Sequence, residues 1–493
     1  MFLHGAASMY RYPPPVPAAA WPATPRRNAY RLGFHLEQHF NAKIYTSGSP
    51  VRGHVLLRPA QDIAYDDFEI SLVGVSSTQN LLQHESAIVA LPFMKLVMPL
   101  CPDSLPASKI FAAGQEYVFR FHFVLPFHLA IGSCRHGCVS PAVKELHLRP
   151  PPTMGFWEGD DQSPQMTQIK YAVAVLATRR LPADPLPARV IAESSMIRVL
   201  PAFPEDAPLD ITPVDDGYAL SRSKTIRRNF VAGKLGRLTA TAAQPKAVML
   251  SPDGHAASAT SCRLTLVFDS VGAGAPSPRI SSVSGKLTSH TYFDMSFMNR
   301  LPNLGNRPSP EATSPYRYTT STKLFSLPVG DLPWREERAE SAWEEAMFPL
   351  ARGVLAPTQE NPSRRASAAT CPDMESSMGS RPRRCVAELD VQFTIPRNNR
   401  KMFLPTFHSC RISRTYTLHL CLAVGQTFST LSLVVPLQIG VESTSDNRMQ
   451  QHEFRAAPGL ALVRGQDRAR RNTYAGLPGY MLESSDHELP GYC

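Results

Sequence analysis

Apolar and polar side chains alternate with a period of two along most of the chain from residue 34 onward. The clearest example is residues 117–124, where the side chains of one face are Tyr117, Phe119, Phe121 and Phe123. The intervening positions hold Val118, Arg120, His122 and Val124. An α-helix would scatter these aromatic rings around its axis, whereas a β-strand places them on one side. The pattern therefore predicts a half-buried strand whose aromatic face meets a core.

The same alternation recurs in two groups of segments, which predicts an all-β fold. The segments are 51–57, 68–73, 117–124, 169–175 and 196–200, followed by 235–241, 262–268, 286–293, 388–395, 416–422 and 431–439. Between the groups, residues 201–216 are rich in Pro and Asp and are typical of a connector. Because 493 residues are too many for one core, we expect two consecutive immunoglobulin-like β-sandwiches, at residues 29–200 and 201–440.

Three segments lack the alternation and are predicted to be disordered. Residues 1–28 are rich in Pro and Ala and cannot bury much apolar surface. Residues 302–384, approximately, are rich in Pro, Ser, Arg and Glu, with helical spacing only at 334–352. They are too many for an ordinary loop, so we expect a disordered insertion in the second sandwich. Residues 441–493 are polar and basic and are expected to form a tail.

Composition restricts the fold class, the partners and the cellular compartment that we expect for the protein. The 46 Pro, against 28 Gly, argue against a helical bundle. The net charge of +10 suits a phosphorylated partner, an anionic membrane or nucleic acid, without choosing among them. The nine Cys are an odd number and are scattered, and no secretory signal pattern is found, so a reducing cytoplasm is expected. No stretch approaches the roughly 20 apolar residues that cross a bilayer, so any membrane contact should be peripheral.

Several segments combine strand patterns with turn residues in a recurring order. They include YTSGSPVRG at 45–53 and YDDFEISLVG at 65–74, then residues 129–136, 147–155 and 160–166, and finally 223–228 with 233–236. The first two resemble the opening strands of an arrestin N-terminal domain, where Gly48 permits a tight turn and Gly53 permits close strand approach. The middle segments are similar to fungal arrestin-like proteins, and the last resembles the start of an arrestin C-terminal domain. The resemblance runs from about residue 34 to 440, without the insertion.

This resemblance implies an α-arrestin, a trafficking adaptor that is not an enzyme. Such an adaptor recognises a membrane transporter or receptor and brings a WW-domain ubiquitin ligase of the HECT type to it, for ubiquitination and endocytosis. The protein would then be cytoplasmic and recruited to the plasma membrane or endosomes. The chain departs from the family pattern in its split second domain and in carrying Leu-Pro-x-Tyr instead of Pro-Pro-x-Tyr.

The tail contains one tetrapeptide twice. The WW-binding candidates are Leu477, Pro478 and Tyr480 in the first copy, and Leu489, Pro490 and Tyr492 in the second. An extended Pro-containing peptide fits the aromatic-lined groove of a WW domain with little loss of entropy, and the Tyr ring fills an adjacent pocket. Two copies suit tandem WW domains. The alternative is two chance turns in a low-complexity tail.

Basic residues suggest two regulatory sites. A phosphate-binding patch is a candidate at Lys224, Arg227, Arg228 and Arg237, because guanidinium groups pair well with phosphate oxygens. A solvated strand edge kept soluble by charge is the favoured interpretation of these residues. Ser367 follows Arg364 and Arg365 at the spacing that basic-directed kinases use, and phosphate there would add about −1.5 to −2 charge. An unmodified Ser in a charged loop is the alternative.

Cysteine and histidine cluster once in the sequence, at Cys134, His136 and Cys138, with His147 nearby. Sulfur and nitrogen ligands suit zinc, but this spacing does not match the usual paired arrangements and no second pair follows. Free thiols and a core histidine are therefore favoured, and neither a metal nor a cofactor is predicted. The chain also lacks a Gly-rich phosphate loop, a Gly-x-Ser-x-Gly elbow and a His-Glu-x-x-His motif, which argues against an enzyme.

Two other functions are compatible with the same fold. A β-sandwich could bind DNA through its loops, but that requires Arg and Lys clustered on one rim, and here the arginines are spread through the insertion and tail. Nucleic acid is therefore not an expected partner. A retromer-like cargo scaffold without ligase recruitment is the other alternative, and the two tail motifs argue against it.

Overall fold

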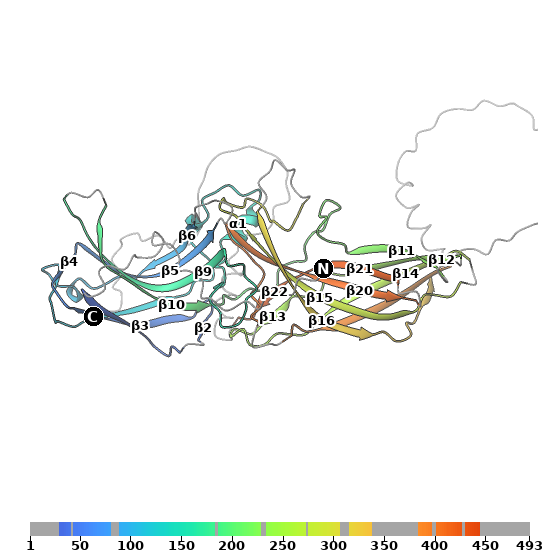
Figure 1. The fold of residues 1–493 in the computed structure, drawn as a ribbon, viewed down its shortest axis with the longest axis horizontal. Helices are drawn as coiled ribbons and strands as arrows, with labels where there is room; N and C mark the ends of the chain where they lie inside the picture. The colour runs from blue at the N-terminus through green and yellow to red at the C-terminus, as the bar shows by residue number, and fades with distance from the viewer. Residues whose placement is uncertain are drawn as a thin grey trace, which may run out of the picture.

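The protein is all-β and elongated, with two groups of strands along its long axis (Figure 1). The structure, a computed structural model, describes residues 29–40, 43–79, 88–182, 186–227, 233–272, 275–305, 315–337, 383–396, 401–425 and 429–443. Within these residues there is one α-helix, α1 (Pro141–His147), and two short 3-10 turns, η1 (Pro102–Ser104) and η2 (Ile131–Ser133). No helix in this part of the chain has the length and apolar character that a membrane span needs.

The first unit contains strands β1 to β10. One sheet has the order β1-β3-β8, and a second sheet has the order β2-β10-β9-β5-β6. A short pair joins β4 to β7. The strands are β1 (Tyr30–Leu36), β2 (Ile44–Tyr45), β3 (Pro50–Pro59), β4 (Ile63–Ala64), β5 (Asp67–Gln79), β6 (Ile88–Val97), β7 (Ile110–Phe111), β8 (Tyr117–Val124), β9 (Thr167–Arg179) and β10 (Ala188–Val199).

The strand predicted from the aromatic alternation is β8, with the predicted bounds. Phe119, Phe121 and Phe123 are buried, whereas the side chains between them are exposed. Full burial of a Phe side chain contributes about 1.5–3 kcal/mol, which explains why this pattern dominates the local structure. The two glycines also lie as expected. Gly48 has a φ of 79°, and a Cβ at Gly53 would collide with the backbone carbonyl of His35.

The second unit contains strands β11 to β22. One sheet has the order β11-β12-β14-β18-β17, and the other has the order β16-β15-β20-β19, with β21 also paired to β20. The strands are β11 (Ser221–Arg227), β12 (Lys234–Ala242), β13 (Val248–Leu250), β14 (Thr260–Ser270), β15 (Ile280–Phe293), β16 (Tyr316–Pro328), β17 (Arg335–Glu337), β18 (Arg384–Phe393), β19 (Phe407–His408), β20 (Ile412–Val424), β21 (Ser429–Leu437) and β22 (Ile439–Val441). Strands β13 and β22 pair in parallel.

The expectation of a disordered insertion at 302–384 is wrong for its early part. Residues 316–328 form β16, which pairs with β15 over almost its whole length, and residues 335–337 form β17. Strand β16 is an edge strand with mostly exposed or half-buried side chains, so it lacks the apolar alternation of a buried strand. Thr and Ser hydroxyls pair across it instead, with Ser289 to Thr320 at 2.8 Å and Thr288 to Ser321 at 3.0 Å. Residues 306–314 and 338–382 of the predicted insertion lie outside the described residues.

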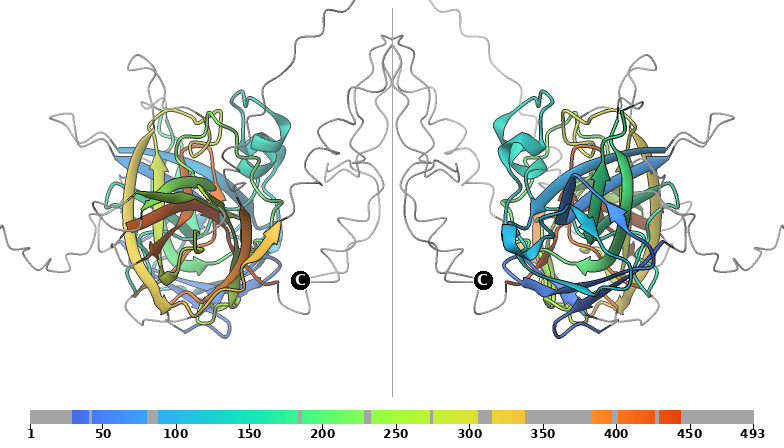
Figure 2. Two further views of the ribbon diagram at one scale, coloured as in Figure 1. Left: turned by 90° about the vertical axis from the view of Figure 1, so that its right-hand side faces the viewer. Right: turned by 90° about the vertical axis from the view of Figure 1, so that its left-hand side faces the viewer.

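Two hydrophobic cores lie between the sheets, which surround them when the molecule is seen along its long axis (Figure 2). The first core is rich in aromatic side chains and the second in aliphatic ones. The first core is not built by the first unit alone, because Phe293, Leu404, Phe407, Cys410 and Ile412 also belong to it. The two units therefore share buried surface where they meet.

Candidate functional site

Most of the sequence-predicted binding residues lie outside the described part of the chain. These are the two tail motifs, with Leu477, Pro478, Tyr480, Leu489, Pro490 and Tyr492, together with Arg228 and Ser367. The WW-binding and phosphorylation hypotheses therefore stay predictions from sequence. The described candidates are three members of the basic patch and the four Cys and His residues.

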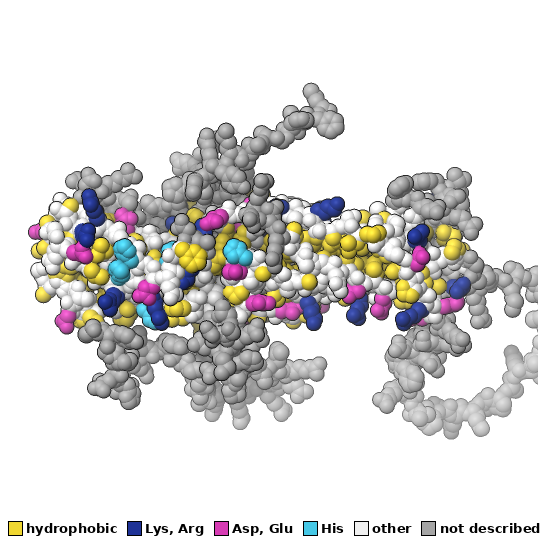
Figure 3. Space-filling model, turned by 90° about the horizontal axis from the view of Figure 1, so that it is seen from below, with side chains coloured by type: hydrophobic (Ala, Val, Ile, Leu, Met, Phe, Trp, Pro, Cys, Tyr) yellow, Lys and Arg dark blue, Asp and Glu magenta, His cyan; other side chains and the backbone are white. Residues whose placement is uncertain are grey.

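The structure does not bring all of the described basic residues onto one face, because Lys224 is separated from Arg237. Lys224 pairs in register with Leu238, and Arg237 pairs with Thr225, so Lys224 and Arg237 point to opposite faces of the sheet. Lys224 lies on the inner side, where its Nζ donates a hydrogen bond of 2.9 Å to the carbonyl oxygen of Thr430 in β21. Arg227 is exposed at the end of β11, beyond a shift in register. On the face in Figure 3, Lys and Arg are likewise scattered among acidic and apolar side chains.

A buried arginine joins the two units. Arg414 of β20 is fully buried, and its guanidinium donates hydrogen bonds to the backbone oxygens of Asp161 at 2.9 Å and Gln162 at 3.2 Å. It also donates to Ser163 Oγ at 3.3 Å. These acceptors lie in the loop that precedes β9, so one side chain of the second unit holds a loop of the first. We call this region, where residues 149–163 meet the second unit, the junction.

The acceptor loop is itself held by its neighbours. Asp161 is buried, and its carboxylate accepts hydrogen bonds from the backbone N–H groups of Gly155 at 2.6 Å and Ser163 at 3.1 Å. Burial raises the pKa of Asp161, and the positive charge of Arg414 opposes that rise. Gln162 has a φ of 59°, and its side-chain oxygen accepts from Ser289 at 3.1 Å and from Thr320 at 2.8 Å. Three strands of the second unit, β15, β16 and β20, therefore fix this loop.

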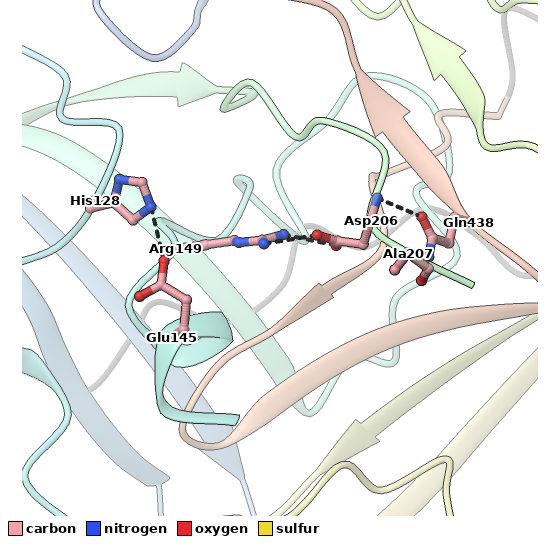
Figure 4. A network of polar contacts seen from close by, with 6 residues as sticks. All are labelled: His128, Glu145, Arg149, Asp206, Ala207 and Gln438. Carbon is pink, nitrogen blue, oxygen red and sulfur yellow. Dashed lines mark hydrogen bonds and ion pairs between the residues drawn. The ribbon is translucent and has the colours of Figure 1, made fainter. Parts of the chain in front are cut away.

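A second arginine bridges the units near the surface. The Arg149 guanidinium makes two hydrogen bonds of 2.8 Å to the Asp206 carboxylate (Figure 4). The backbone N–H of Asp206 donates to the side chain of Gln438 at 3.0 Å, and that amide donates to the Ala207 oxygen at 3.2 Å. The same view shows His128 beside Glu145 of α1, with 3.1 Å between Nε2 and Oε1. Arg149, the connector and Gln438 between β21 and β22 are thus linked.

Four potential metal ligands also converge beside the junction. They are Cys134, His136, Cys138 and His147, here called the Cys–His cluster, and their ligand atoms all lie within 4.8 Å of one another. The Cys134 sulfur lies 3.9 Å from the Cys138 sulfur, 3.5 Å from His136 Nε2 and 3.8 Å from His147 Nδ1. The Cys138 sulfur lies 3.7 Å from His147 Nδ1. Cys134 and His147 are buried, and the other two are half-buried.

Local sequence explains this convergence. The three ligands in the loop after η2 are spaced by two residues, and Arg135 and Gly137 between them are exposed, as in an extended segment that turns alternate side chains to one side. The fourth comes from α1, whose start is fixed by Pro141 and by the Ser140 side chain, which accepts from the Val143 N–H at 3.3 Å. About two turns later α1 ends at His147, whose Nδ1 faces the sulfurs of Cys134 and Cys138.

The sequence argued against a metal because no second pair of ligands follows Cys134 and Cys138. In the folded chain, His136 and His147 lie beside these cysteines and supply a second pair. Burial lowers the pKa of His147 to about 4, so its imidazole is neutral at pH 7 and able to bind a metal. Burial, with Cys134 adjacent, raises the pKa of the Cys138 thiol to about 11. A divalent cation would oppose that rise, because it stabilises the thiolate. The helix α1, which supplies the fourth ligand, was not expected from the sequence.

No protein-family model matches the chain, and no curated protein sequence matches it. The fold and the junction place it in the class of all-β proteins with β-sandwich-like units. Its particular function has to be inferred from its own residues.

Proposed function

We propose that this chain is an arrestin-like trafficking adaptor, not an enzyme, that recruits a WW-domain ubiquitin ligase of the HECT type to membrane transporters or receptors. The observation that carries the proposal is the duplicated Leu-Pro-Gly-Tyr motif at 477–480 and 489–492. It stands beyond two β-sandwich-like units, in the order that the arrestin resemblance implies.

The two units and the motifs have complementary parts in this proposal. Packed sheets joined through a buried junction offer a preformed surface for the cytoplasmic tail of a cargo protein. Each Leu-Pro-Gly-Tyr copy offers a WW domain its Pro and its Tyr ring. Recruitment through both copies strengthens binding, because the second contact forms at high effective concentration. The adaptor would act in the cytoplasm and at the plasma membrane or endosomes.

The test is binding of the full-length chain to a purified tandem WW-domain fragment, measured by calorimetry. Either single variant, Tyr480→Ala or Tyr492→Ala, should bind the tandem WW-domain fragment about 10²-fold or more weakly, because the avidity of two linked sites is lost. The double variant should abolish binding. Tyr474→Ala is the matched control, since Tyr474 lies in the same tail but has no preceding Leu-Pro.

The alternatives give different results in the same experiment. Undiminished WW binding by the double variant would remove the motifs from the mechanism. Absence of any WW binding, with cargo still captured in cells, would favour a retromer-like scaffold. Duplex DNA binding that falls steeply with salt and depends on sequence would favour the DNA-binding alternative.

A further inference from the structure

We propose that the Cys–His cluster binds one structural zinc ion, a role that the adaptor hypothesis neither requires nor supplies. The cluster offers two sulfur and two nitrogen ligands, a set that in tetrahedral geometry selects zinc. Four protein ligands leave no open position for substrate, so the site is structural and not catalytic.

Four of the six separations between the ligand atoms are close to those of a tetrahedron around zinc. With Zn–S near 2.3 Å and Zn–N near 2.05 Å, tetrahedral geometry places two sulfurs about 3.8 Å apart and a sulfur and a nitrogen about 3.6 Å apart. The observed sulfur–sulfur separation is 3.9 Å. Three of the four sulfur–nitrogen separations are 3.5, 3.7 and 3.8 Å, and all six separations within the cluster are at most 4.8 Å.

The outer surroundings of one ligand also fit. His136 turns Nε2 toward Cys134, and its other ring nitrogen, Nδ1, lies 3.2 Å from the carbonyl oxygen of Gly137. With Nε2 bound to a metal, Nδ1 carries the proton and donates it to that oxygen. A second hydrogen bond of this kind fixes the tautomer and orientation of most metal-binding histidines.

Weak hydrogen bonds among thiols and imidazoles are the alternative explanation for the cluster. They would not require four ligand atoms to approach a common centre, whereas metal binding does. Here a period-two loop and a capped helix bring their ligands to that centre from separate directions. The convergence of two local structures on one tetrahedron is what favours zinc.

The proposed ion would stabilise the contact between the units. The His136 ring stacks on Phe297 of the second unit, with centroids 4.8 Å apart and planes 3° from parallel. Next to it, the Val139 N–H donates to the Asn299 oxygen at 2.9 Å. An ion that holds residues 134–147 in this shape therefore also holds the surface on which the 297–299 loop rests.

Metal analysis of the full-length protein tests the site, with purification through a tag that does not bind metal. We expect about one zinc per chain by mass spectrometry, removed by a strong chelator at a cost in thermal stability. Cobalt added to the chelated protein should give the intense visible bands of tetrahedral Co2+ and a thiolate-to-cobalt charge-transfer band. These spectra need no variant, so a misfolded mutant cannot obscure the result.

Variants then locate the ion. His136→Ala and Cys138→Ser change half-buried ligands and should each lower zinc content at least about tenfold after dialysis against a weak chelator. Cys421→Ser and His122→Ala are the matched controls, because these residues lie on β20 and β8 and are not members of the cluster, and they should keep wild-type zinc. The proposal is overturned by wild-type protein that holds no zinc and gives no tetrahedral cobalt spectrum, or by ligand variants that retain full zinc content.

Discussion

Two arginines connect the units of this molecule, and their surroundings are opposite. Arg414 is fully buried, and its hydrogen bonds go to oxygens of a loop whose own polar groups are buried with it. Arg149 makes the better ion-pair geometry, two bonds of 2.8 Å to Asp206, but its side chain is 21% exposed and that of Asp206 is 44% exposed. A guanidinium group thus joins the units at two places: that of Arg414 in the buried interior, and that of Arg149 in contact with water.

The comparison shows that hydrogen-bond geometry alone does not decide which of the two contacts contributes more to the free energy of unfolding. Water solvates Arg149 and Asp206 when they separate, so little free energy is lost. When Arg414 is removed, no water reaches its partners to replace it, because the loop carbonyl groups and the Asp161 carboxylate stay buried. Stability should therefore depend far more on Arg414 than on Arg149.

The largest effect is expected for Arg414→Leu. It leaves the backbone oxygens of Asp161 and Gln162 without their donor and removes the positive charge that stabilises the Asp161 carboxylate, which should lower the free energy of unfolding by about 3–5 kcal/mol. Urea unfolding of the full-length chain measures this change.

A second substitution sharpens the interpretation. Adding Asp161→Asn to Arg414→Leu removes the uncompensated charge and should recover part of the lost stability. If Arg414→Leu instead costs less than about 1 kcal/mol, the buried network does not hold the junction in the way that burial implies.

An intermediate effect is expected from pH, through His290 of β15. Burial lowers its pKa to about 4, with smaller contributions from the positive charges of Arg317, His419 and Arg414. Above pH 6.5 the ring is neutral in both folded and unfolded chains. Between pH 6.5 and 4 the unfolded chain takes up a proton that the folded chain excludes, so stability falls as pH falls through this window. This contribution is on the order of 2–3 kcal/mol.

The variant His290→Gln isolates that contribution. Gln keeps a polar group near Thr417, the hydrogen-bond partner of His290 at 2.9 Å, but does not titrate. The loss of stability between pH 7 and pH 4 should be smaller in the variant than in the wild type, as measured by urea unfolding at both pH values. Equal losses in the two proteins would show that His290 is not held neutral by the fold.

The smallest effect is expected for Arg149→Ala. An ion pair this exposed should contribute about 1 kcal/mol or less, and its contribution should shrink in high salt. A double-mutant cycle with Asp206→Asn, measured at low and high salt, gives the coupling energy. A coupling as large as the effect of Arg414→Leu would mean that exposure does not separate the two arginines.

Sequence reasoning located strands where one face is apolar and the other polar. It placed β8 correctly because the Phe side chains alternate with exposed residues. It failed for β16, whose Thr and Ser side chains pair across an edge and carry no apolar signal. The strand predicted to begin at residue 416 is β20, which in the structure begins at Ile412. The prediction began too late because the polar residues Ser413, Arg414 and Thr415 interrupt the apolar pattern.

The junction was less accessible from sequence than the strands. Arg414 is buried by a loop some 250 positions earlier in the chain, and no local pattern contains that information. The Cys–His cluster left a visible signal in its three alternating residues, but its fourth member depends on α1 turning back toward the loop. The missing signal was Ser140-Pro141, a helix start that places His147 one helix length away.

The parallel pair of β13 with β22 has a consequence for where a bound partner would sit. It places Val441 beside the connector, where Phe203 and Val441 exchange backbone hydrogen bonds, near the middle of the long axis (Figure 1). The chain thus enters and leaves the second unit near the middle of the long axis. A partner that binds the chain beyond β22 is therefore attached to the body near the middle of its long axis, and not at either end.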